Sequence, residues 1–246
     1  MIDAALHDVR RRIHAAAERA HRPASDIRLI AVSKTYPAST VLEAVRAGQL
    51  EFGENRVQEG LAKIDATRQR QGSGGPAPEL EWHLIGHLQT NKAKKAAAAF
   101  AWIHSVDSVE LVHKLDAAAV EAGTTPKILI QVDLAHEATK SGADMRDIPA
   151  IVAAARRCRA VQLAGLMIVP PIAENPEDAR PWFRQLRDVR DALVVAGTPA
   201  SSLRELSMGM SHDFEVAIEE GSTMVRVGSA IFGARAYPPP ADFSTH

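Results

Sequence analysis

The sequence predicts a single closed (β/α)8 barrel with one extra helix at its N-terminus. Eight short apolar or β-branched runs alternate with longer helical patterns, which favours parallel strands joined by crossover helices. The 246 residues match the roughly 250 that one such barrel needs. A hydrophobic fraction of 46% and a charged fraction of 24% are typical of a globular chain with a sizeable core. A doubly wound open sheet is the alternative fold.

The N-terminal segment, residues 1–22, predicts an amphipathic helix. Ile2, Leu6, Val9 and Ile13 recur at three- and four-residue spacing, which places them on one helix face. Three consecutive arginines at residues 10–12 lie on the other face, where we expect them to be solvated.

The first half of the barrel follows this helix. Strands are predicted at short apolar and β-branched runs, and helices where apolar residues recur with a three- or four-residue period. In order, the elements are a strand at 28–32, a helix at 39–47, a strand at 50–52, a helix at 57–69, a strand at 82–85, a helix at 91–99, a strand at 100–104 and a helix from 107 to 122. Asp107 or Ser108 caps the last helix, and Gly123 ends it.

The second half continues the alternation to the eighth strand. Its elements are a strand at 127–132, a helix at 148–157, a strand at 161–167, a helix at 177–195, a strand at 204–207, a helix at 213–220 and a strand at 224–227. Asn175 and Pro176 mark the start of the long helix. We expect residues 1–246 to form one domain. Within it we expect a flexible surface loop at 71–79, rich in glycine and proline, and a disordered tail at 238–246.

Charge and cysteine content exclude several classes of protein. A net charge of −1 gives no electrostatic argument for a nucleic-acid partner. The single cysteine, Cys158, forms no intrachain disulfide, and we interpret it as a tolerated, partly buried thiol although neighbouring arginines could activate it. No apolar run approaches a membrane span, and the polar start resembles no signal peptide. We therefore expect a cytoplasmic protein without a membrane partner, and a monomer.

Lys34 is the first candidate functional residue, because it directly follows the first predicted strand. Barrel sites are built at the carboxyl ends of the strands. A lysine desolvated there has a lowered pKa and can attack a carbonyl to form a Schiff base. The alternative is a surface lysine that happens to follow a strand.

Two Gly- and Ser-rich loops follow the seventh and eighth strands. The first contains Ser211 and Asp213, and the second begins with Gly228 and Ser229. Glycine allows close approach of the backbone, and hydroxyls and N–H groups at a helix start favour anions, so the two loops together predict a phosphate clamp. Alternatively, Ser211 or Asp213 merely caps the following helix.

A lysine nucleophile and a phosphate clamp on one barrel end suggest pyridoxal 5′-phosphate (PLP). Arg226, just before the second loop, would then face the pyridine nitrogen. Because an arginine stays protonated, it disfavours a second proton on that nitrogen and weakens the ring as an electron sink. This argues against transaminase chemistry and permits racemisation or simple holding of the cofactor. The alternative is a structural ion pair at the barrel rim.

Six stretches in order along the chain resemble the pyridoxal phosphate homeostasis proteins. They are A-V-S-K-T-Y-P (31–37), F-G-E-N-R-V-Q-E (52–59), W-H-L-I-G-H-L-Q-T-N-K (82–92), G-L-M-I-V-P-P (165–171), L-S-M-G-M-S-H-D-F (206–214) and V-R-V-G-S-A-I-F-G-A-R (225–235). The resemblance implies a fold-type III PLP barrel, like the N-terminal domain of alanine racemase. It implies that Lys34 carries PLP as an internal aldimine, with phosphate contacts from Ser211, Gly228 and Ser229 and with Arg226 near the ring nitrogen.

Further residues match motif positions of that family. Asn55, His83 and Met167 follow or end the second, third and sixth strands, and the resemblance implies that they belong to the cofactor site. Arg56 stands where a tyrosine is frequent, and Ile168 where a smaller or sulfur-containing residue is frequent. These departures affect the expected packing against the cofactor ring and the contacts at the outer rim of the site.

Two other groups of residues are weaker candidates for a functional site. His83 and His87 have helical i, i+4 spacing, but the segment is predicted as strand and turn, so we expect no metal site. Lys140, in a loop near the barrel mouth, is a candidate second amine for the cofactor, with a solvent-exposed lysine as the alternative.

The leading hypothesis is a PLP-binding protein of vitamin B6 homeostasis that holds PLP without strong catalysis and buffers it or delivers it to apo PLP-dependent enzymes. An amino-acid racemase is the first alternative. It needs acid–base groups on both faces of the cofactor, and we expect no second domain after Phe232 to supply one. A PLP-free scaffold barrel with an incidental lysine is the other alternative.

Overall fold

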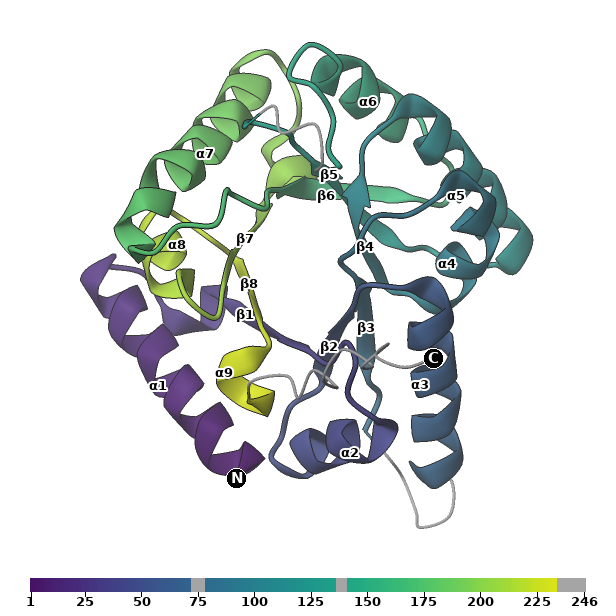
Figure 1. Cartoon of the computed structure of the whole chain (residues 1–246). Coiled ribbons are helices and arrows are strands. Elements are labelled where there is room, and N and C mark those ends of the chain that lie inside the picture. Colours follow the sequence, from purple (N-terminus) through teal and green to yellow (C-terminus); the bar gives the residue numbers. More distant parts are fainter. Residues whose placement is uncertain (72–77, 136–140, 234–246) are drawn as a thin grey trace, which may run out of the picture.

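The computed structural model describes residues 1–71, 78–135 and 141–233. Its eight parallel strands are β1 (Arg28–Val32), β2 (Glu51–Glu54), β3 (Glu81–Leu84), β4 (Trp102–Val106), β5 (Lys127–Gln131), β6 (Gln162–Met167), β7 (Glu205–Met210) and β8 (Met224–Val227). Each strand pairs with the next in chain order, and β8 pairs with β1 to close the barrel (Figure 1). The closure confirms the predicted barrel and excludes the open sheet.

Helices surround the strands as an outer ring (Figure 1). They are α1 (Ile2–Arg19), α2 (Ala38–Arg46), α3 (Val57–Gln71), α4 (Ala93–Ala99), α5 (Val109–Ala122), α6 (Ile148–Ala155), α7 (Arg180–Val195), α8 (Phe214–Glu219) and α9 (Ser229–Phe232), with short 3-10 turns at Ala24–Asp26, Thr90–Lys92, Pro176–Ala179 and Ala200–Leu203. The cap prediction for α5 is confirmed: Ser108 accepts the N–H of Leu111, and Gly123 ends the helix in the left-handed region at φ 67°.

Helix α1 buries the predicted apolar face, because Leu6, Val9 and Ile13 are all shielded from solvent. The prediction that the arginine run is simply solvated is wrong for two of its three members. Arg10 donates to the carbonyl oxygens of Ala47 and Gly48, and Arg12 pairs with Glu215 at 3.2 Å. These contacts attach α1 to the barrel's neighbouring helices on both sides.

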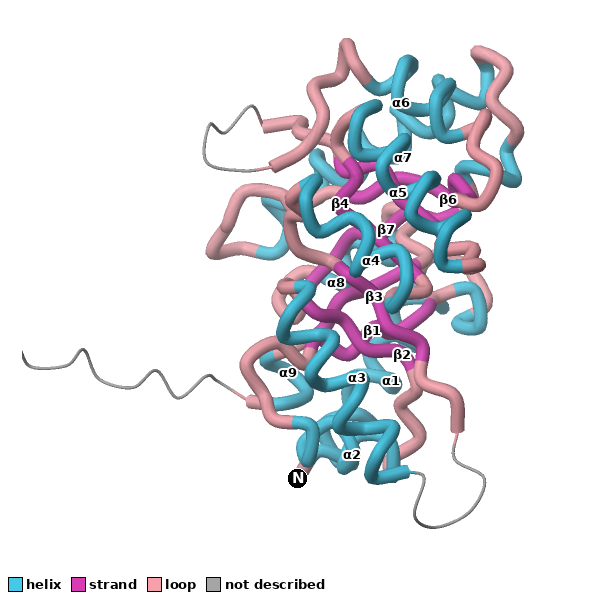
Figure 2. Tube along the Cα trace, turned by 90° about the vertical axis from the view of Figure 1, so that its right-hand side faces the viewer, coloured by secondary structure: helices cyan, strands magenta, loops and turns pink. Residues whose placement is uncertain are grey.

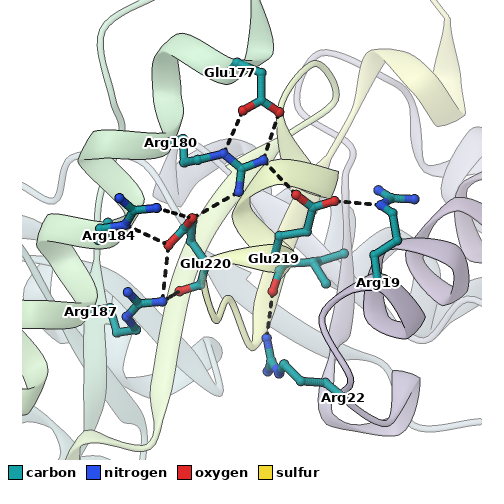
Figure 3. A network of polar contacts seen from close by, with 9 residues as sticks. Arg19, Arg22, Glu177, Arg180, Arg184, Arg187, Glu219 and Glu220 are labelled. Atoms are coloured by element: carbon teal, nitrogen blue, oxygen red, sulfur yellow. Dashed lines mark hydrogen bonds and ion pairs between the residues drawn. The ribbon is translucent and has the colours of Figure 1, made fainter.

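An ion-pair network joins α1, α7 and α8 (Figure 3). Arg180 pairs with Glu219 at 2.7 Å and with Glu220 at 3.0 Å. Arg19 of α1 reaches Glu219 at 2.7 Å, and Arg184 of α7 reaches Glu220 at 3.0 Å. The arginines beside Glu220 hold the pKa of its carboxyl below the usual value, although burial opposes this.

Apolar residues form two shells. The larger shell lies between the barrel and the helices, and a smaller one fills the barrel interior. The smaller shell contains Ile30, Trp102, Leu129, Met167 and Met224. In the side view the strands occupy the centre, and helices lie above, below and over them (Figure 2). The barrel is therefore a packed core, and only its ends offer room for a ligand.

Several element ends shift by up to three residues from the prediction, and three differences stand out. Strand β4 begins at Trp102 rather than residue 100, because Phe100 ends α4 and packs beside Gly60 of α3. Strand β7 continues to Met210, three residues beyond its predicted end, through Gly209 at φ 94°. Helix α9, directly after β8, was not predicted.

Among the described residues, no helix combines the length and the apolar character needed to cross a bilayer.

Candidate functional site

A cavity of about 490 Å³ lies at the carboxyl ends of the strands. Six of the eight predicted site residues line it: Lys34, Asn55, Ser211, Arg226, Gly228 and Ser229. They follow or end β1, β2, β7 and β8, whose pairing around the closed barrel brings distant parts of the sequence to one end. The arrangement follows the general rule for barrels of this class.

The turn that carries Lys34 is held on both sides. Thr35 has a left-handed backbone, at φ 71°, and its N–H donates to Glu59 of α3 at 2.5 Å. The Tyr36 hydroxyl donates to the carbonyl of Gly233 at 2.8 Å, and its ring lies 5.2 Å from that of Phe232. These contacts hold the left-handed backbone of Thr35 in place. The partly buried Lys34 beside it thereby lines the cavity.

A buried polar cluster beneath this turn was missed by sequence reasoning. Lys63 Nζ donates to the Ser33 carbonyl and to Glu54 Oε1, each at 2.6 Å, and to Glu59 Oε1 at 2.9 Å. Ser33 Oγ also donates to Glu54 at 2.6 Å. Burial raises the pKa of Glu54, although Lys63 and Ser33 oppose the shift. The only sequence signal was the i, i+4 pair of Glu59 and Lys63 on α3.

The loops after β7 and β8 meet at Ser211. Its Oγ accepts the N–H groups of Gly228 at 3.1 Å and Ala230 at 3.4 Å. Asp213 does not cap α8 with its side chain but accepts the N–H of Met210 at 2.6 Å, which closes the turn. Backbone N–H groups that converge on one hydroxyl oxygen at a cavity wall form a concave donor site for an anion.

Arg226 forms the floor of the cavity and is 4% exposed. Its Nη1 donates to Ser207 Oγ at 2.6 Å and its Nη2 to the carbonyl of Ile168 at 2.8 Å. Both acceptors are neutral, so the alternative of a rim ion pair does not describe these contacts. Burial lowers the pKa of Arg226 to about 10, which leaves it a cation at neutral pH.

His83 and Met167 lie inside the barrel, below the cavity rather than in its wall. Both are fully buried. Met167 belongs to the apolar interior shell, and the His83 ring stacks on Trp102 at 5.7 Å. A motif match identifies the strand that carries a residue, but it does not show whether the side chain of that residue reaches the cavity.

Sequence reasoning missed other cavity-lining residues. Tyr36, His87, Gln131 and His212 all face the cavity from the turns or strand ends around it. Their positions directly after or at the end of predicted strands were the available signal. His87 pairs with Asp107 at 3.6 Å.

The remaining sequence candidates gain no functional role. The described part of the chain holds no cluster of three or more His, Cys, Asp or Glu suited to a metal ion. His83 sits in the barrel interior whereas His87 lines the cavity. Burial raises the pKa of Cys158 to about 11, so its thiol is less reactive than an ordinary cysteine. Lys140, most of the 71–79 loop and the 238–246 tail lie outside the described residues.

Known proteins are similar to this chain in sequence and in fold. The family model described as "Alanine racemase, N-terminal domain" matches residues 5–236. The pyridoxal phosphate homeostasis protein of Aquifex aeolicus is 42% identical over 232 residues, which cover 94% of this chain and 97% of that protein.

Solved structures agree with the sequence comparison. PipY of Synechococcus elongatus PCC7942, solved with PLP bound, superposes with a TM-score of 0.80 at 39% identity and covers 95% of this chain and 100% of that one. Alanine racemase of Clostridium difficile 630 shares the fold, with a TM-score of 0.65 at 16% identity over 92% of this chain and 56% of its own. By sequence and by fold, the chain belongs to the pyridoxal phosphate homeostasis proteins, a family built on the alanine racemase N-terminal domain.

Proposed function

We propose that this protein binds PLP in the cavity at the carboxyl end of the barrel and holds it for buffering or delivery to apo-enzymes, without strong catalysis. The observation that carries the proposal is that Lys34 and the Ser211 donor site line the same cavity. The relatedness to PLP homeostasis proteins, and to PipY with PLP bound, supports it.

The residues present fit this cofactor. The cavity volume lies within the range of small-molecule sites, roughly 300–1,000 Å³. The N–H groups of Gly228 and Ala230, which now point at Ser211 Oγ, are donors for a phosphate oxygen placed beside that hydroxyl. Arg226 supplies a buried cation opposite the proposed ring nitrogen.

When bound, PLP supplies an aldehyde that condenses reversibly with a primary amine. Among the residues that the structure describes, Lys34 supplies the amine at this cavity, and the hydrogen bonds of Thr35 and Tyr36 limit the directions from which it can approach a ligand. Because Arg226 stays protonated, it would donate a hydrogen bond to the ring nitrogen of a bound cofactor and would not transfer its proton to that nitrogen. We infer that the site favours retention of the cofactor over withdrawal of electrons from a substrate.

A reduction experiment tests the binding site. Purified protein incubated with PLP and then with borohydride should gain the mass of the reduced cofactor on the peptide that contains Lys34. Lys34→Ala should lose this adduct, whereas Lys95→Ala, at an exposed lysine of α4, should keep it. An adduct of full yield in Lys34→Ala would refute the assignment.

A second measurement separates a holder from a racemase. Loaded protein incubated with L-alanine in deuterated water should show little exchange of the α-proton, and should restore activity to an apo PLP-dependent enzyme. Rapid exchange would favour the racemase, with a cavity residue such as Tyr36 or His87 as the second acid–base group.

A further inference from the structure

Three buried hydrogen-bond contacts and one longer contact link polar side chains through the barrel interior, from the cavity floor to the opposite end. Arg226 Nη1 donates to Ser207 Oγ at 2.6 Å, and Ser207 Oγ lies 2.9 Å from His104 Nδ1. His104 Nε2 lies 3.0 Å from His83 Nδ1. His83 Nε2 lies 3.4 Å from Glu51 Oε2, a contact too loose to count as a hydrogen bond, and Glu51 Oε2 also pairs with Arg28 at 2.9 Å. The line therefore crosses five strands, from β8 to β2.

The chemistry of the two ends of this line favours one placement of the protons along it. A guanidinium only donates and a carboxylate only accepts. Ser207 therefore accepts from Arg226 and gives its hydroxyl proton to His104 Nδ1. His104 carries its proton on Nε2 and donates to His83 Nδ1. His83 carries its proton on Nε2, which points at Glu51. The opposite tautomers would set a bare nitrogen of His83 against the carboxylate.

Burial favours the neutral form of both histidines. Burial lowers the pKa of His83, and it lowers that of His104 further below its ordinary value. A proton on His104 would also be repelled by the cations nearby. The charged and titratable groups that act on one or both rings are Glu51, Glu81, Arg28 and Arg226, besides each other.

We propose that this line of side chains is a directional relay that positions Arg226 and balances its charge through the distant carboxylate of Glu51. The inference deepens the proposed function and rests on it, because Arg226 matters to PLP only if PLP occupies the cavity. Ser207, His104 and His83 are then positioning residues, which act on the cofactor through Arg226.

The physical basis is the alignment of dipoles. Each member turns a lone pair toward Arg226 and its own N–H or O–H away from it. Aligned hydrogen bonds polarise one another, and a low local dielectric strengthens the effect. The direct partners of Arg226, the Ser207 hydroxyl and the Ile168 carbonyl, are neutral. The relay gives the buried cation an indirect link to a carboxylate.

The relay spans most of the barrel's height. Glu51 begins β2, and Asn55, which lines the cavity, is four residues later. At about 3.3 Å per residue, the two levels are roughly 13 Å apart. A charge at the amino-terminal end of the barrel therefore influences the cavity without touching its ligand.

Nitrogen-15 NMR of histidine side chains tests the relay in PLP-free protein. His83 and His104, assigned through His83→Asn and His104→Asn, should both show the neutral Nε2–H tautomer. They should not titrate between about pH 8 and pH 6, where ordinary histidines do. An Nδ1–H tautomer at either ring, or protonation in this range, would overturn the proposed direction of the relay.

A matched pair of variants tests its effect on the cofactor. Glu51→Gln removes the terminal charge of the relay, and Glu81→Gln removes a carboxylate that pairs with the same Arg28 but lies outside the relay. We expect Glu51→Gln to raise the Kd for PLP about three- to tenfold, a range set by ordinary coupling energies, and Glu81→Gln to change it less than about twofold. Equal effects in the two variants, or none in Glu51→Gln, would overturn the proposal.

The two measurements also separate this inference from the proposed function. Failure of the wild-type protein to bind PLP would count against the proposed function. The tautomers would still decide whether the relay exists, because they are read without the cofactor.

Discussion

Replacement of Lys63 by methionine tests whether the buried cluster beneath β1 stabilises the fold and the Lys34 turn. The change keeps an apolar stem of similar length and removes the ammonium group. That group makes contacts of 2.6 Å to Glu54 and to the Ser33 carbonyl. The Lys63 and Glu54 side chains are 7% and 0% exposed, so water cannot replace the lost partner.

The size of the effect follows from this burial. Removing one partner of a buried ion pair costs about 3–5 kcal/mol. We expect about 3 kcal/mol in Lys63→Met, at the lower end of that range, because Ser33 Oγ still donates to Glu54. For a chain of this size, each 1 kcal/mol lowers Tm by about 2–4 °C, which gives a fall of about 6–12 °C.

The loss of stability should grow with pH. Burial already raises the pKa of Glu54, so the folded state keeps a proton that the unfolded state releases. The free energy of unfolding therefore falls as pH rises from the pKa of Glu54 in the unfolded chain, about 4.3, through its pKa in the folded protein. Without the Lys63 cation the folded pKa rises further. The variant should be more strongly destabilised at about pH 8 than at about pH 5.

Reversible unfolding in urea measures these differences, at both pH values, for wild type, Lys63→Met and the double variant Lys63→Met/Glu54→Gln. The double variant should regain more than half of the lost stability, because it no longer buries an uncompensated carboxylate. A loss below about 1 kcal/mol in the single variant, or a double variant no more stable than the single one, would refute the reasoning.

Three further predictions concern other parts of the molecule. Arg226→Ala should weaken retention of PLP in equilibrium dialysis, since it removes the buried cation of the cavity floor, and unchanged retention would remove Arg226 from the cofactor's edge. Glu220→Gln should cost about 2 kcal/mol at neutral pH in urea unfolding. Because the pKa of Glu220 is lowered by its arginines, this difference should vanish as pH falls well below the ordinary carboxyl value, and a difference independent of pH would contradict the assignment. Gly165→Ala should prevent stable folding, because its Cβ would lie 1.8 Å from the Glu205 carbonyl oxygen; a soluble variant with unchanged Tm would show that the β6–β7 pairing tolerates a shift.

The sequence allowed the fold and much of the candidate site to be predicted for a physical reason. In a parallel barrel, polar residues directly after apolar strands gather at one end. Lys34, Asn55 and Gly228 follow that rule, and the structure places all three on the cavity. Their roles toward PLP remain predictions for the experiments above.

The features that could not be predicted depend on contacts between residues that are distant in the chain. The direction of a side chain within a buried strand is not visible in a nearly continuous apolar run. The resemblance marked His83 as a site residue, whereas the structure buries it outside the cavity lining. The carboxylate of Glu54 lies nine residues from Lys63, which reaches it only because α3 packs against β2. Gly209 looked like a loop residue, yet β7 passes through it.

Barrel closure also determines when the protein can take up its ligand. Lys34 follows the first strand and Gly228 the last, and the two meet because Ile30 aligns with Arg226 and Ala31 with Val227. Nearly two hundred residues separate the two halves of the cavity, so the cavity exists only once β8 has paired with β1. During synthesis, Lys34 would leave the ribosome long before Gly228, in the loop that we propose binds the phosphate. The cofactor would thus bind only to a chain whose barrel has closed. A nascent chain would hold Lys34 without the rest of the cavity.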